Sequence, residues 1–564
     1  MPTTSPARAF DDLAARFLAE YLRLEPVRAT EAGAHAHDAT WPDVTVAGDR
    51  ARRAFAESTL AALAALPKDG LDEPRRVDAK ILDNQLRYRL FAAEELRELD
   101  TSPLAYTGLI GDGLDPLVTR DFAPIEARMA SLLGRLQGIP AIVEAARKRL
   151  AHPARLVTET AIEQNRGLIA LCEADLGATF AKVPAQRTEL EAAARRATSA
   201  LRELQAFLEK DLLARSDGDF RLGATRFAKK LGFELDDDVD PAEIVRGARA
   251  LLARTQEEMV ATAREVAPAL TPARPVPRLD TAAEKKAFVK AVLDACAADH
   301  PTDATIVSEG RRLLAEATAF VRAHDLVRVP DEPCGVIEMP EYRRGVAVAY
   351  CDASGPLEQK QETFYAISPT PAGWSAPRVA SFYREYNRAM LADLTVHEAM
   401  PGHFLQIMHA NRFRSHVRAV FSSGPFVEGW AVYAEGVMAA HGFGGPRVRL
   451  QRQKMVLRLA ANAILDHETH AGAMDEGAAI ALMTQEAFQE EGEAIGKWKR
   501  ARLTSAQLTT YYFGFTEMTK LRAEHEKRPG FRERTYHDRL LSFGSPAMRH
   551  VRELMAGPAD APTR

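Results

Sequence analysis

Apolar residues recur at helical spacing along the first half of the chain, and this periodicity limits the fold more than any other feature of the sequence. The first apolar stripe consists of Phe10, Leu13, Phe17, Leu18, Tyr21 and Leu22. Similar stripes cover residues 125–150, 157–180, 188–213 and 242–266. Because apolar residues at i, i+3, i+4 and i+7 share one face of a helix, these segments are predicted to be helices that bury that face in a core.

Two breaks interrupt the helical pattern. The first contains four prolines within a short stretch: Pro268, Pro272, Pro275 and Pro277. These are predicted to stop a helix, because proline lacks the amide hydrogen and clashes with the preceding turn. After Pro330, the runs 345–350 and 362–367 have β character and are separated by Asp352-Ala-Ser-Gly-Pro356, which predicts a hairpin. The helical pattern returns after Pro377.

The fold is therefore predicted to be mostly α, with one small β-hairpin or sheet before the segment that carries the chemistry. Three regions are expected: an N-terminal helical region (1–270), a connecting region with the small sheet (271–376) and a catalytic helical region (377–564). A chain of 564 residues is long enough to form a deep cleft, and we expect the three regions to form one continuous body.

Composition and charge exclude several classes of protein. The 74 Lys and Arg nearly balance the 78 Asp and Glu, so the net charge of −4 provides no basic field for nucleic acid. No run approaches the roughly 18 apolar residues of a membrane-spanning helix. The first 26 residues mix Arg8 and Arg16 with acidic residues and lack the apolar core of a secretory signal, which predicts a cytoplasmic protein. The sequence contains no Cys-x-x-Cys pair, so its four cysteines are predicted to be buried small hydrophobic residues in a reducing compartment.

The most informative segment is His397-Glu398-Ala-Met-Pro401-Gly402-His403, which resembles a zinc-peptidase signature with an alteration. In His-Glu-x-x-His, two imidazoles share one helix face, and the glutamate activates the attacking water. Here Pro401 stands where the second histidine is usual, and His403 lies about 240° round an ideal helix from His397. Either the pattern is accidental or the helix is distorted. Pro401 and Gly402 can break a helix and let His403 begin a new segment that faces His397.

Catalytic zinc usually has a third protein ligand, and two carboxylates are candidates for it. Glu428 lies 25 residues after His403, and Glu435 follows seven residues later, on the same face of an amphipathic stretch. One carboxylate can bind the metal, and the other can orient a metal ligand through a hydrogen bond.

The combination of the first segment with Phe426-Val-Glu428-Gly-Trp430 resembles a bacterial family of unknown function, DUF885. The likeness extends over almost the whole chain, from Gly33-Ala-His35-Ala-His37-Asp38 to residues 537–546. Members of this family are taken as gluzincin-like zinc metallopeptidases that are distantly similar to thimet oligopeptidase. The resemblance therefore implies a large helical body with a deep cleft.

The resemblance also implies roles for individual residues. His397, His403 and Glu428 would hold Zn²⁺ and Glu398 would be the general base, which leaves Glu435 to orient a metal ligand. His470 matches a family histidine that lines the cleft, and Tyr511 matches a tyrosine turn. One of these two side chains would donate a hydrogen bond to the developing oxyanion.

The sequence thus predicts a metallopeptidase that hydrolyses peptide bonds in oligopeptides, with the hairpin offering an edge strand to an extended peptide, as in thimet-like enzymes. Two alternatives stay open: a zinc amidohydrolase that acts on a non-peptide amide, and a catalytically inactive peptide-binding protein of the same fold. The expected partner is a peptide or small amide substrate, with neither nucleic acid nor membrane. The sequence leaves the oligomeric state open.

Overall fold

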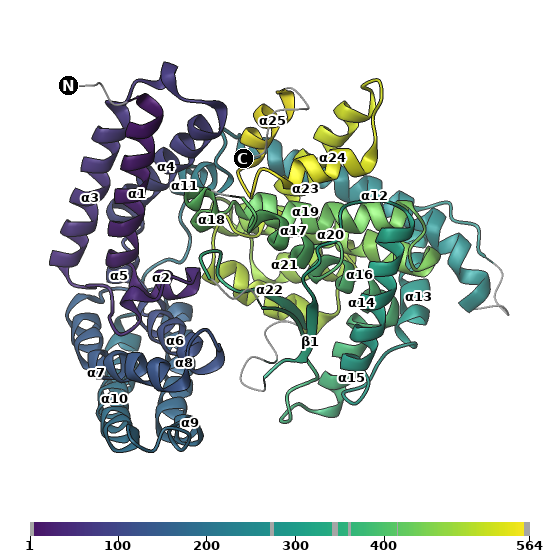
Figure 1. The fold of residues 1–564 in the computed structure, drawn as a ribbon. Coiled ribbons are helices and arrows are strands. Elements are labelled where there is room, and N and C mark those ends of the chain that lie inside the picture. Colours follow the sequence, from purple (N-terminus) through teal and green to yellow (C-terminus); the bar gives the residue numbers. More distant parts are fainter. Residues whose placement is uncertain are drawn as a thin grey trace. The chain divides into compact units, whose positions relative to one another are not determined.

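The computed structural model describes residues 5–270, 276–340, 344, 348–358, 362–413 and 415–557. Helices make up most of this part of the chain, so the predicted mostly α fold is confirmed (Figure 1). The chain divides into two compact units, Met1–Leu222 with Ser354–Gln361 and Gly223–Ala353 with Glu362–Arg564. The three predicted regions, 1–270, 271–376 and 377–564, describe changes in sequence pattern and stay a prediction.

The first unit is built from helices that bury the apolar stripes seen in the sequence. Its core lies among α6, α7, α8 and α10, where Leu132, Leu136 and Leu201 are fully buried. Single turns of π-helix follow α8 and α10 within two of the predicted helical segments. The helices of this unit are α1 (Pro6–Leu24), α2 (Pro26–Ala32), α3 (Val46–Ala64), α4 (Glu73–Phe91), α5 (Glu98–Thr101), α6 (Leu104–Thr119), α7 (Ile125–Arg149), α8 (Arg155–Ala170), α9 (Leu176–Phe180) and α10 (Arg187–Phe207).

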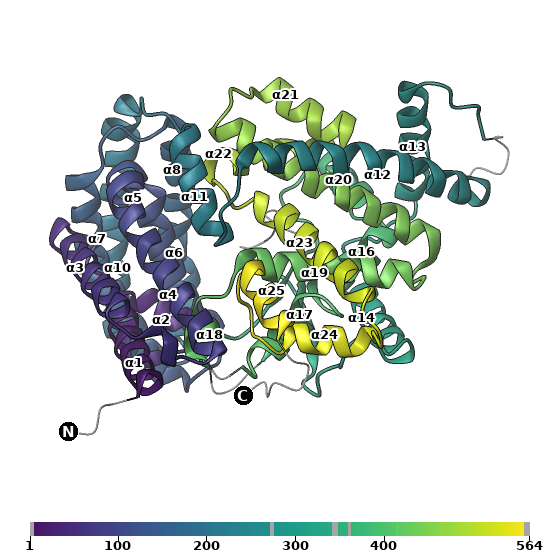
Figure 2. The same ribbon diagram turned by 90° about the horizontal axis from the view of Figure 1, so that it is seen from above.

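The second unit holds the remaining helices and the sheet. Its longest helices, α12 and α20, pack side by side (Figure 2). The helices are α11 (Ala224–Leu235), α12 (Pro241–Leu270), α13 (Ala282–Ala297), α14 (Ile306–Ala323), α15 (Ala376–Glu385), α16 (Arg388–Glu398), α17 (His403–Ala410), α18 (His416–Val420), α19 (Gly424–Ala440), α20 (Gly445–His470), α21 (Glu476–Ala481), α22 (Glu491–Leu503), α23 (Thr509–Glu526), α24 (Glu533–Leu541) and α25 (Met548–Ala556).

The proline-rich break is a connection within the second unit. Helix α12 continues through Pro268 and ends at Leu270, four residues later than the apolar stripe suggests. Residues 276–281 are not helical, and α13 starts at Ala282 behind a capping box formed by Thr281 and Glu284. Pro277 lies in this non-helical stretch, as expected of a residue that cannot supply the amide hydrogen for another turn, whereas Pro272 and Pro275 lie outside the described residues.

A three-stranded sheet precedes the helices that carry the predicted site. Strand β3 (Thr363–Ile367) lies in the centre, antiparallel to β2 (Ala349–Asp352) and parallel to β1 (Cys334–Glu338). Strands β2 and β3 form the antiparallel pair of the predicted hairpin, although residues 345–347 of the first predicted run lie outside the described residues. Strand β1, a short segment that contains Gly335, was not predicted from the sequence. A side chain at Gly335 would lie 2.6 Å from the ring of Phe364, so the pairing with β3 requires glycine there.

Candidate metal centre

The helix break between His397 and His403 is present in the structure. Helix α16 ends at Glu398, and α17 begins at His403. Between them, the amide of Gly402 donates a hydrogen bond to the carbonyl oxygen of Val396 at 2.9 Å. A Cβ atom at Gly402 would lie 1.9 Å from the carbonyl oxygen of His397, so this close approach is open only to glycine. The break lets the two histidines come from different helices, as predicted.

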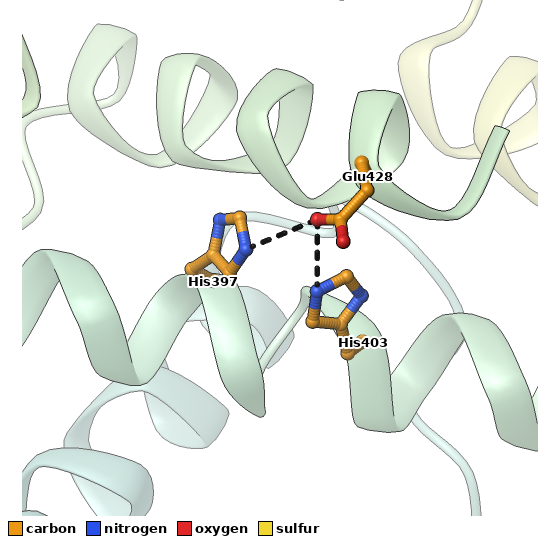
Figure 3. A group of neighbouring side chains, drawn as sticks. All are labelled: His397, His403 and Glu428. Atoms are coloured by element: carbon orange, nitrogen blue, oxygen red, sulfur yellow. Dashed lines mark ion pairs between the residues drawn. The ribbon is translucent and has the colours of Figure 1, made fainter. Parts of the chain in front are cut away.

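Both imidazoles face the carboxylate of Glu428 (Figure 3). The distances from Glu428 Oε2 are 3.7 Å to His397 Nε2 and 3.5 Å to His403 Nε2. The two rings are nearly perpendicular, with centroids 4.7 Å apart. One ligand atom from each residue lies within 4.8 Å of the others, so this His-His-Glu group could hold a metal ion.

The geometry of the three side chains fits a metal better than it fits hydrogen bonds among them. Glu428 Oε2 is sealed from solvent and has no hydrogen-bond partner among the described residues. Its distances to the imidazole nitrogens are long for hydrogen bonds. Metal–ligand bonds of about 2.0–2.2 Å in a tetrahedron place ligand atoms roughly 3.3–3.6 Å apart, close to the two distances seen here. Three protein ligands also match the number that catalytic zinc sites use.

A second carboxylate orients the first histidine. Glu435 Oε1 lies 2.6 Å from His397 Nδ1, and the side chain of Glu435 is 1% exposed. Burial lowers the pKa of His397, but Glu428 and Glu435 outweigh it and hold that pKa well above its usual value. A carboxylate on Nδ1 fixes the ring so that Nε2 points at the metal position. Glu428 and Glu435 thus lie on one face of α19, as their spacing predicts.

Packing around α19 holds the break segment in place. Trp430, two residues after Glu428, donates a hydrogen bond from Nε1 to the carbonyl oxygen of Pro401 at 2.8 Å. His537 packs edge-on against the Trp430 ring, with centroids 5.6 Å apart. The helix that supplies the carboxylate therefore also fixes the loop that positions His403.

Glu398 follows His397 at the end of α16 and is held by the sheet. Its Oε2 accepts a hydrogen bond from the amide of Cys351 in β2 at 3.1 Å. Burial raises the pKa of Glu398 above its usual value, with His397 and His403 acting to lower it and Glu428 to raise it. A raised carboxyl pKa lies closer to neutral pH, which suits an acid–base group. No sequence pattern indicates Cys351, because a backbone amide donates its hydrogen bond whatever side chain the residue carries.

The two other predicted residues have different surroundings. Tyr511 lies in α23, which crosses α19 at two glycines, and a Cβ at Gly429 would lie 2.5 Å from the backbone of Gly514. Burial raises the pKa of Tyr511, and the charge of Glu428 adds to this effect.

His470, by contrast, ends α20 with its Nε2 lying 2.8 Å from the carbonyl oxygen of Ala501 and 2.7 Å from that of Thr504. Its ring also stacks on Phe227, with centroids 6.0 Å apart. The structure thus places Tyr511 on the helix that crosses α19 and gives His470 contacts with other residues. The catalytic role of each stays a prediction.

Substitution of the two carboxylates should separate metal binding from support of the metal ligands. Glu428→Ala removes a ligand and is expected to release the metal. Glu435→Ala should leave the metal bound, with affinity or activity lower by about 10–100-fold, as is usual when the hydrogen-bond partner of a ligating histidine is lost. Metal content after dialysis against a graded chelator series checks both variants. A site emptied by Glu435→Ala but not by Glu428→Ala means that the two roles are reversed.

The chain belongs to the DUF885 family, whose description is "bacterial protein of unknown function" and whose model matches residues 26–555. Two solved structures resemble the whole chain. One, described as "a putative lipoprotein of unknown function" from Shewanella oneidensis, is 30% identical and has a TM-score of 0.83, covering 97% of this chain and 100% of its own. The other, "the putative lipoprotein from Colwellia psychrerythraea", is 18% identical with a TM-score of 0.80, covering 98% and 100%. No curated protein matches the chain.

The predicted cytoplasmic location is wrong. The structure from Shewanella oneidensis, 30% identical to this chain, is described as "a putative lipoprotein", and a covalently attached lipid anchors a protein of that kind at a membrane. The prediction rested on the mixed charges and the missing apolar stretch of residues 1–26.

The reducing compartment predicted for the cysteines depended on the cytoplasmic location, so it is no longer supported. No disulfide joins them among the described residues; Cys172 and Cys296 are buried, and Cys334 and Cys351 are half-buried in strands. Among the described helices, none has the length and hydropathy to span a bilayer.

Proposed function

We propose that the protein is a zinc-dependent hydrolase that cleaves peptide bonds in oligopeptides. The observation that carries this proposal is the convergence of His397, His403 and Glu428 at one point, beside the half-buried Glu398. Two neutral nitrogen ligands and one carboxylate favour zinc over calcium or magnesium, which prefer oxygen ligands alone. A carboxylic acid–base group next to such a site is the combination that hydrolysis of an amide requires.

When bound, zinc lowers the pKa of a coordinated water to about 7 and polarises a carbonyl oxygen as a Lewis acid. The residues of the chain supply the remaining steps. Glu398 accepts the proton of the attacking water and passes it to the nitrogen of the leaving amine. The Cys351 amide holds one oxygen of Glu398 and so fixes the carboxylate during both transfers. The hydroxyl of Tyr511 donates a hydrogen bond to the developing oxyanion.

The sheet gives a reason to favour a peptide over another amide as substrate. Among the described strands, β2 lies at one side of the sheet, since the order of those strands is β1-β3-β2. It also contains Cys351, whose amide reaches Glu398. An extended peptide that runs alongside β2 lies beside the acid–base group. The 30% identity to a protein described as a lipoprotein supports a cell-envelope location, so we infer that the substrates are peptides of the envelope or its surroundings.

Metal analysis combined with peptide digestion tests the proposal. The purified protein is expected to contain one zinc ion per chain and to cleave members of a mixed peptide library, with loss of cleavage after chelation and recovery on adding zinc. A matched panel of non-peptide amides run beside the library distinguishes an amidohydrolase. A metal content far below one per chain after growth with zinc, or no cleavage by a zinc-loaded sample, contradicts the proposal.

A further inference from the structure

Two lysines of the second unit are buried, and they differ in their partners. Lys454 on α20 forms an ion pair with Glu385 at 2.8 Å, and the amide of Glu490 donates to the same carboxylate oxygen at 3.1 Å. Lys497 on α22 is 7% exposed, and among the described residues it has neither a hydrogen-bond partner nor a carboxylate within ion-pair distance. A buried ammonium group without a partner is costly, because burial removes its hydration and nothing replaces it.

The charges around Lys497 do not compensate for its own. Glu493, one turn earlier on α22, is already engaged by Arg458 of α20 and accepts a hydrogen bond from Tyr386 at 3.3 Å. Arg500, one turn later, donates to the side-chain oxygen of Gln507 at 2.7 Å, and no carboxylate of the described residues lies within ion-pair distance of it. Lys497 and Arg500 therefore leave one face of α22 with more positive charge than the neighbouring carboxylates neutralise.

Burial lowers the pKa of Lys497 to about 7, with Arg458 and Arg500 lowering it and Glu493 and Glu428 raising it. The packing places this face of α22 near the metal group, because Arg500 donates to Gln507 just before α23, and α23 packs against α19, the helix that carries Glu428. Arg500 also interacts with Tyr511, whose pKa responds to both Arg500 and Glu428. Arg500, by contrast, is exposed, so the pair can be reached from solvent at the Arg500 end.

We propose that Lys497 and Arg500 form a subsite that binds a carboxylate of the substrate beside the metal centre. The inference rests on the proposed peptidase function and deepens it, because it names the chemical class of substrate. A bound carboxylate supplies the counter-charge that the chain itself lacks, through charge-assisted hydrogen bonds from an ammonium and a guanidinium group. The carboxylate is the C-terminus of a short peptide or an acidic side chain near the bond that is cleaved.

Kinetics on matched substrates test the subsite. One oligopeptide is prepared with a free C-terminal carboxylate, with a C-terminal amide, and as the amide with a glutamate beside the cleaved bond. The protein should cleave at least one carboxylate form about 10-fold or more better than the plain amide, in kcat/KM. Lys497→Met should lose about 10–100-fold on that form and little on the plain amide, as expected for one hydrogen bond between charged groups. The substrate whose kcat/KM falls in Lys497→Met shows whether the subsite binds the C-terminal carboxylate or the acidic side chain.

Two further lysine variants separate a binding role from a structural one. Lys499→Met makes the same change two positions along α22, about 200° round the helix, and should leave the substrate preference unchanged. Lys497→Met should melt at the same temperature as the unmodified protein or higher, because it removes an unpaired buried charge. Lys454→Met should melt lower, since it leaves Glu385 buried without its partner. A lower melting temperature for Lys497→Met, with equal losses on all three substrates, means that Lys497 is structural and overturns the proposal.

A binding measurement without turnover separates the subsite from the reaction. Calorimetry on zinc-loaded Glu398→Gln compares the free-acid, glutamate-containing and plain amide peptides, with and without the added Lys497→Met change. If no peptide is hydrolysed but a carboxylate form binds with a preference that Lys497→Met removes, the subsite stands and the proposed function fails. If peptides are hydrolysed and bound with no preference for either carboxylate form, the proposed function stands and the subsite fails.

Discussion

Glu398→Gln is expected to reduce peptide hydrolysis by about 10²–10⁴-fold while the metal stays bound, which is the usual cost of losing a general acid–base group. The change keeps the size of the side chain and leaves an oxygen to accept the hydrogen bond from Cys351. It removes only the capacity to take up and release a proton. Single-turnover rates and metal content, measured on the same sample, separate a loss of chemistry from a loss of zinc.

A matched change at an exposed glutamate, Glu491→Gln at the start of α22, controls for the loss of one negative charge. It should leave the rate and the metal content unchanged. A Glu398→Gln variant that keeps more than about a tenth of the unmodified rate would show that another group moves the proton. The pKa of Glu398 is raised by burial, so the acid limb of the pH–rate profile should lie above the pH at which an ordinary carboxyl titrates and should disappear in the variant.

Much of the fold and the metal group follows from patterns that are local in sequence. The apolar stripes of α1, α7 and α12 are sufficient to predict those helices, because one buried face is what each helix needs to pack. The two histidines and a carboxylate from Glu428 or Glu435 could be proposed together because metal ligation restricts the residue types and their number, and the family resemblance selected Glu428. The helix break was predictable because Pro401 and Gly402 each disfavour a continuous helix.

Features that depend on contacts between distant segments could not be predicted in this way. Strand β1 exists only because β3 supplies its partner and Gly335 makes room for Phe364. The crossing of α19 with α23, the helix that carries Tyr511, depends on the contact between Gly429 and Gly514, which no local pattern encodes. Lys497 looks like an ordinary helical lysine in the sequence. Its missing partner becomes visible only when α15, α20 and α22 are placed together.

Gly402→Ala is expected to abolish metal binding, although it adds a single methyl group. The new Cβ would lie 1.9 Å from the carbonyl oxygen of His397 and 2.3 Å from that of Val396. Both obstacles are backbone atoms of the last turn of α16, so no side-chain rotation relieves the clash. The connection between α16 and α17 must shift, and this moves His403 relative to His397. Overpacking of this kind typically costs about 1–3 kcal/mol of stability, and the metal site is lost because its ligands no longer converge.

A glycine with open space around it provides the control for Gly402. Gly167 lies within α8, where an added Cβ meets no atom within 4 Å, so Gly167→Ala should keep the metal and gain about 0.5–1 kcal/mol of stability. Zinc content and chemical unfolding of the metal-free forms report the two effects separately. Full zinc binding by Gly402→Ala with a lowered unfolding midpoint would show that the clash is absorbed elsewhere, and that His403 reaches the metal without the close approach of Gly402 to α16. Loss of zinc in Gly402→Ala alone would show that the break exists to place the second histidine.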